Sequence, residues 1–192
     1  MHGPVQAAWL LVALCAATGA YCLLRMRSRI EEQRRTAGGE ALMGFGMAVM
    51  AAPAAVVALP RWTWAVSAAV FAAATLHGLW LSLGPARSDR HHVHHLIGAL
   101  AMVYMSVAMI AAPGGHAGHG GTGLPPLTGA LLLYFAGYVL WSGARLAPAR
   151  TVAAGEGAVG GAPVLGWGDR PELALACRLS MGMGMLAMLL TL

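Results

Sequence analysis

Apolar residues run along this chain in long blocks, without the alternation of a half-buried strand or the single apolar face of a surface helix. Six blocks approach the length of a membrane-spanning helix, which needs about 20 mostly apolar residues. Proline and glycine separate the blocks, as at Pro60, Pro85 and Pro148. The sequence therefore predicts an all-α, polytopic transmembrane helical bundle, folded as a single domain over residues 1–192. The predicted spans cover residues 4–24, 40–59, 62–83, 92–112, 125–146 and 172–191.

Composition agrees with a lipid bilayer as the solvent of these helices. Hydrophobic residues make up 58% of the chain and charged residues 10%, whereas a soluble domain carries about 25% charged residues. All twelve basic residues are arginines, and they form no basic patch interleaved with aromatic side chains. No nucleic-acid partner is therefore expected. The expected partners are the lipid bilayer and a metal ion, together with a further copy of the chain or a membrane partner protein.

The arginines also predict an orientation. Ten of the twelve, including Arg25 after the first span, lie in loops on one side of the membrane, and the opposite loops hold only Arg61. Because arginine in short loops marks the cytoplasmic side, both termini are predicted outside, in a multi-pass protein of the bacterial plasma membrane. The segment 147–170, rich in glycine, alanine and proline, is predicted as a flexible cytoplasmic loop.

One short pattern occurs twice. Residues 43–50 read M-G-F-G-M-A-V-M and residues 181–188 read M-G-M-G-M-L-A-M, so both copies follow M-G-x-G-M-x-x-M. Thioether sulfur is a soft ligand that suits Cu(I), and glycine lets neighbouring helices approach closely. Methionine also fills irregular gaps in cores. The repeat is thus open to two interpretations, a copper site and close helix packing.

Methionine and histidine form a stripe on the fourth span. At about 100° per residue its members share one face, over about 27 Å of helix. Similar stripes lie on the second span, after Glu40, and on the sixth. These three spans would run in the same direction, so we expect their soft ligands to converge on a shared axis. The stripes comprise His91, His95, Met102, Met105 and Met109; Met43, Met47 and Met50; and Cys177, Met181, Met185 and Met188.

Histidines gather at the start of the fourth span and after its end. Three histidines at the start of the fourth span share one helix face, and a fourth histidine, on the third span, is expected at a similar depth in the membrane. The members are His77, His91, His94 and His95. Such imidazoles suit Cu, Zn or Fe, and the alternative is a partly protonated group that binds anionic lipid headgroups. The loop after the fourth span carries His116 and His119, a His-x-x-His pattern expected to collect metal at the surface.

Two charged residues occupy equivalent positions before the two copies of the repeat. Glu40 and Arg178 each stand three residues ahead of a copy. A charge inside a bundle is costly and usually paired. We expect an ion pair between them; the alternative is that each side chain extends separately toward the headgroups.

The cysteines lie in apolar spans without a C-x-x-C motif. They are Cys15, Cys22 and Cys177. Buried thiols of this kind usually serve as small packing residues. No disulfide framework is expected.

The whole-chain pattern resembles a family of uncharacterised small polytopic membrane proteins from GC-rich Gram-positive bacteria, which carry a domain of unknown function. The resemblance rests on residues 43–50, on the stripe from His91 to Met109 with Tyr104, and on residues 181–188. It implies no activity. The Met-x-x-x-Met spacings are also similar to those of high-affinity copper transporters, which implies Cu(I) ligand chemistry.

Three functions fit these features. The first is Cu(I) binding, transport or delivery through the methionine and histidine ligands. An alternative is a metal-dependent membrane oxidoreductase, in which the histidine cluster holds copper, iron or haem and acts on a lipid or quinone. A second alternative is a non-catalytic membrane subunit or assembly factor whose methionines only pack. No catalytic residue is assigned, because no serine or cysteine stands in the context of a nucleophile.

Overall fold

The computed structural model describes residues 3–28, 30–53, 56–57, 59–82, 90–111, 123–155 and 170–192. Each regular element within these ranges is a helix, which confirms the all-α class. The helices are α1 (Gly3–Arg25), α2 (Glu31–Met50), α3 (Arg61–Ser82), α4 (Arg90–Ala111), α5 (Pro125–Gly155) and α6 (Pro171–Leu190).

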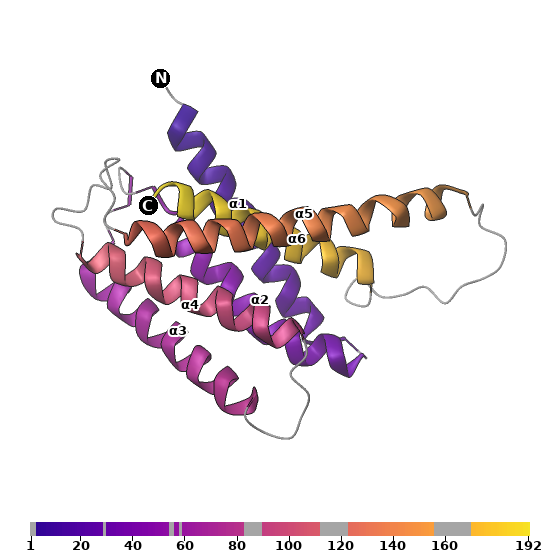
Figure 1. Cartoon of the computed structure of the whole chain (residues 1–192), viewed down its shortest axis with the longest axis horizontal. Coiled ribbons are helices and arrows are strands. Elements are labelled where there is room, and N and C mark those ends of the chain that lie inside the picture. Colours follow the sequence, from indigo (N-terminus) through magenta and orange to yellow (C-terminus); the bar gives the residue numbers. More distant parts are fainter. Residues whose placement is uncertain are drawn as a thin grey trace.

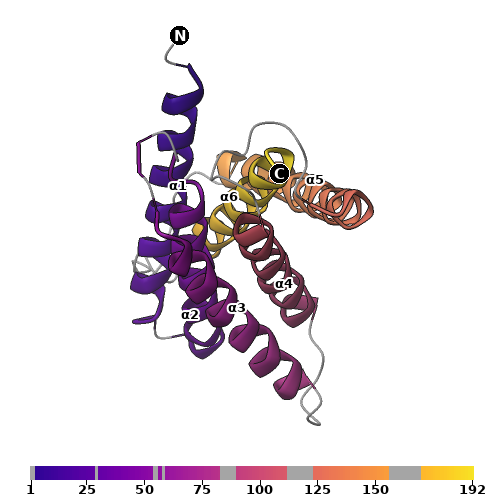
Figure 2. The same cartoon turned by 90° about the vertical axis from the view of Figure 1, so that its left-hand side faces the viewer.

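Consecutive helices pack as hairpins, α1 with α2, α3 with α4 and α5 with α6. The hairpins are joined because α2 contacts α4 and α6, and α1 contacts α6. Figure 1 shows α5 extending beyond α6, and Figure 2 shows the α3–α4 hairpin inclined to α1. The even-numbered helices therefore lie toward the middle of the molecule, where they bring the two copies of the repeat together.

Large apolar side chains cover the outside of the bundle. Leu133, Leu140 and Trp80 are 78%, 73% and 72% exposed, whereas the buried interior is rich in alanine, methionine and cysteine. Five helices of the described chain are long and apolar enough to cross a membrane. The remaining helix, α2, has acidic and basic residues through its first half. These features indicate a membrane protein and support five of the six predicted spans.

The end of α2 differs from the predicted span over 40–59. The helix begins at Glu31 and ends at Met50. The Ala51 N–H closes the last turn, and Pro53 follows without an N–H of its own. The sequence-based prediction overlooked this proline and extended the span to the next one.

The end of α5 differs from the predicted loop over 147–170. The helix continues through Pro148 as far as Gly155, and residues 156–169 lie outside the described part of the chain. The residues that follow the proline are mostly alanine and arginine, which favour helix. A single proline therefore did not end the element.

The glycines of the repeat are positions of close helix contact. A Cβ atom at Gly44 would lie 2.9 Å from backbone atoms of Gly19, so α1 and α2 touch through these two glycines. In the second copy, a Cβ atom at Gly182 would lie 2.9 Å from Val139 on α5. Packing thus explains these glycines directly.

Replacing Gly44 with alanine should lower the thermal unfolding midpoint in detergent. The backbone of Gly19 cannot move aside as a flexible side chain can, and overpacking costs about 1–3 kcal/mol. The matched control is Gly39→Ala on the same helix, where an added Cβ would meet nothing within 4 Å. This variant should be neutral or more stable, since alanine favours helix over glycine by about 1 kcal/mol. Equal destabilisation by both substitutions would contradict the close contact at Gly44.

Candidate functional site

Methionines from α2, α4 and α6 meet in one buried cluster, as the three stripes predicted. Seven of them are buried: Met43, Met47, Met102, Met105, Met181, Met185 and Met188. Met50 is half-buried and packs against this cluster, and Met109 is half-buried on α4. The geometric convergence is therefore present, while the metal role of these residues stays a prediction.

Two methionines of different repeat copies come together at Gly98 on α4. A Cβ atom at this glycine would lie 3.1 Å from Met43 Sδ and 3.9 Å from Met185 Cε. Met43 occupies the space that the missing side chain leaves, and the methyl group of Met185 reaches its edge at van der Waals distance. Thioether side chains from α2 and α6 thus approach the same point on the surface of α4.

A second group of sulfur atoms surrounds Gly184 on α6. A Cβ atom added at Gly184 would lie 3.6 Å from Met47 Sδ and 3.5 Å from Cys15 Sγ. Both side chains are buried. Cys15 was not among the predicted ligands, and its seven-residue spacing from Cys22, which places both on one face of α1, was the available signal.

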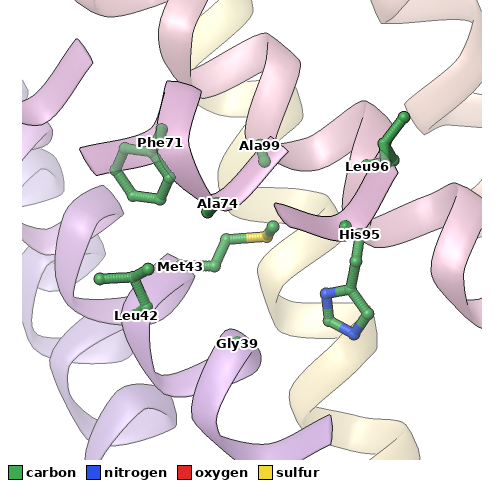
Figure 3. Close-up of a pocket in the computed structure, with 9 residues that line it drawn as sticks. Gly39, Leu42, Met43, Phe71, Ala74, His95, Leu96 and Ala99 are labelled. Carbon is green, nitrogen blue, oxygen red and sulfur yellow. The ribbon is translucent and has the colours of Figure 1, made fainter. Parts of the chain in front are cut away.

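His95 lies one turn before Gly98 on the same face of α4, at the spacing where side-chain positions are about 5–6 Å apart. A cavity of about 120 Å³ between α2, α3 and α4 is lined by His95, Met43 and Phe71. Figure 3 shows the Met43 thioether and the His95 ring at this cavity, among small and apolar residues. The cavity thus combines one thioether and one imidazole within mainly apolar walls.

The carboxylate of Glu40 lies close to the imidazole ring of His95. His95 Nε2 lies 3.8 Å from Glu40 Oε1. Metal-binding histidines commonly direct one ring N–H toward a carboxylate, which fixes the ring and raises the basicity of the other nitrogen. Nδ1 is the ring nitrogen of His95 that does not face this carboxylate.

Glu40 is the centre of a buried ion cluster. Its Oε1 accepts a hydrogen bond from Arg178 Nε at 2.8 Å, which confirms the predicted pair. Its Oε2 pairs with Arg25 and lies 3.7 Å from the Sγ atom of Cys22. Glu40 and Arg25 are both fully buried. The cluster joins α1, α2 and α6, and it reaches α4 through His95.

Arg25 is a correction to the sequence-based prediction, which placed it in a cytoplasmic loop. It is the last residue of α1 and is 0% exposed. Within the described chain, its Nε and Nη2 atoms have no hydrogen-bond partner. Two guanidinium groups, those of Arg25 and Arg178, thus face one carboxylate.

The histidines of the predicted cluster have different neighbours. The His94 ring stacks on Tyr138 with 3.7 Å between centroids, and its Nδ1 lies 3.1 Å from the Tyr134 hydroxyl on α5. His95 faces α2 instead, and His77 is exposed on α3. Among the side chains described, no three of His, Cys, Asp or Glu are grouped to hold a metal ion. Outside the description lie the side chain of His91 and the residues His116 and His119.

A family model described as a domain of unknown function (DUF5134) matches residues 32–192. The chain belongs to this family. The matched range of the DUF5134 chain contains Glu40, His95 and both copies of the methionine repeat, and it begins after α1. Membership of an uncharacterised family is therefore confirmed, while the bacterial source and the similarity to copper transporters stay predictions. The DUF5134 chain matches no curated protein and no solved structure.

Replacing Glu40 with glutamine should destabilise the DUF5134 protein by about 3–5 kcal/mol, because Arg25 and Arg178 would lose their buried counter-charge. Denaturant unfolding in detergent measures the change. The control is Glu31→Gln on the same helix, whose partner Arg35 is 77% exposed, and no resolvable change is expected there. A Glu40→Gln protein as stable as the wild type would contradict the structural role of the cluster.

Proposed function

We propose that this DUF5134 protein binds Cu(I) in its helix core and acts in Cu(I) transport or delivery in the bacterial plasma membrane. The observation that carries the proposal is the meeting of Met43 and Met185 at Gly98. Thioethers are soft ligands that favour Cu(I) over harder cations. Two such ligands leave the ion exchangeable, as transfer requires.

His95 supports the same site as a third ligand. Its ring lines the cavity with Met43, and Glu40 on its far side orients it. The other lining residues are small or apolar, and they supply neither a carboxylate nor a hydroxyl. A set of two sulfurs and one imidazole suits Cu(I) better than it suits magnesium, calcium or manganese, which prefer oxygen ligands.

The sulfur atoms of α6 extend the site into a path. Met181, Met185 and Met188 are all buried in the core, at helical spacings that place neighbours about 5–6 Å apart. A series of weak sites allows an ion to enter and to leave. In this proposal both termini lie outside, His116 and His119 exchange metal there, and the protein works as a homo-oligomer or with a membrane partner protein.

The double substitution Met43→Leu/Met185→Leu should weaken Cu(I) binding at this site by at least about tenfold. Leucine keeps the apolar volume and removes the sulfur. Competition with a chromogenic Cu(I) chelator, under reducing conditions in detergent, measures the affinity. The matched control is Met183→Leu in the same repeat, because Met183 is 45% exposed and lies outside the core. Unchanged affinity in the double variant, or an equal loss in the control, would contradict the thioether site.

A further inference from the structure

The contacts between α1 and α6 define an antiparallel register. Thr18 Oγ1 lies 3.1 Å from Ser180 Oγ. Closer to the start of α1, Cys15 Sγ lies against Gly184. In successive contacts, the residue number on α1 therefore decreases as the residue number on α6 increases. Continued by one turn in the other direction, this register places Cys22 opposite Cys177.

The register sets the two thiols opposite each other across α1 and α6. Cys22 is fully buried, while Cys177 is half-buried. Cys22 Sγ also lies 3.7 Å from Glu40 Oε2. The thiol pair thus borders the ion cluster.

Arg25 supplies a buried positive charge beside this pair. It is fully buried, it pairs with the same Glu40 Oε2 that Cys22 approaches, and its Nε and Nη2 find no partner in the described part of the chain. Metal binding displaces the protons of coordinating thiols. Two thiolates that share one monovalent cation carry a net charge of minus one, which these N–H groups can face.

We propose that Cys22 and Cys177 form a second Cu(I) site, in which both sulfurs bind one ion. Two Cu–S bonds form, two S–H bonds break, two protons leave to solvent, and copper remains Cu(I). The inference rests on the proposed Cu(I) function but uses ligands separate from the thioether site. Because thiolate is the stronger soft ligand, this site fills first. Cys177 shares a face of α6 with Met181 and Met185, so the ion can pass from one site to the other.

Proton release separates the two sites, because thioethers have no proton to lose. The full chain in detergent, in weak buffer with a pH indicator, is titrated anaerobically with Cu(I) as its acetonitrile complex. The first equivalent should release about two protons from the wild type. Met43→Leu/Met185→Leu should keep this release and Cys177→Ser should lose it. Cys15→Ser, which alters the third cysteine, should keep it.

Absence of proton release at the first equivalent, or unchanged release in Cys177→Ser, would overturn the thiolate site. If release persists while Met43→Leu/Met185→Leu leaves the affinity of later equivalents unchanged, the thioether site fails and the thiolate site stands. A measurement on the wild type alone guards against misfolded variants. Diamide oxidation and peptide mapping should find a Cys22–Cys177 disulfide that one equivalent of Cu(I) prevents. Oxidation without this disulfide, or disulfide formation unaffected by Cu(I), would overturn the proposal.

Discussion

The rest of the bundle depends on the buried carboxylate of Glu40. Lipid is as apolar as the helix surfaces, so hydrophobic burial does little to align helices with one another in a membrane. Glu40 supplies that alignment, because Arg25, Arg178 and His95 reach it from three other helices. A displacement of α1 or α6 relative to α2 would leave a buried charge without its partner. The cluster therefore fixes the register in which both repeat copies face inward.

Packing and ligand chemistry use the same residues in this core. Glycine at 44 and 182 admits a neighbouring helix, while glycine at 98 and 184 admits sulfur-bearing side chains. Methionine is flexible enough to fill the spaces that result. Buried thioethers alone are therefore compatible with a packing role. His95 adds the feature that packing does not require, since it joins the Met43 cavity to the carboxylate of Glu40.

Features of single helices predicted much of this arrangement. Long apolar blocks gave the all-α fold, methionine spacing gave the inward faces of α2, α4 and α6, and equivalent positions before the repeat gave the Glu40–Arg178 pair. Such features could not give the register between helices, which sets Cys22 opposite Cys177. Arg25 was misplaced because an arginine after an apolar block usually lies in a loop. His94 and His95 have different neighbours because adjacent residues point about 100° apart on a helix.

Copper X-ray absorption spectroscopy on the wild-type protein loaded with Cu(I) in detergent identifies the atoms bound to the metal. We expect Cu(I) surrounded mainly by sulfur, with one nitrogen neighbour that is lost in His95→Gln. A shell of nitrogen and oxygen alone would contradict this expectation, as would a protein that retains no Cu(I) under reducing conditions.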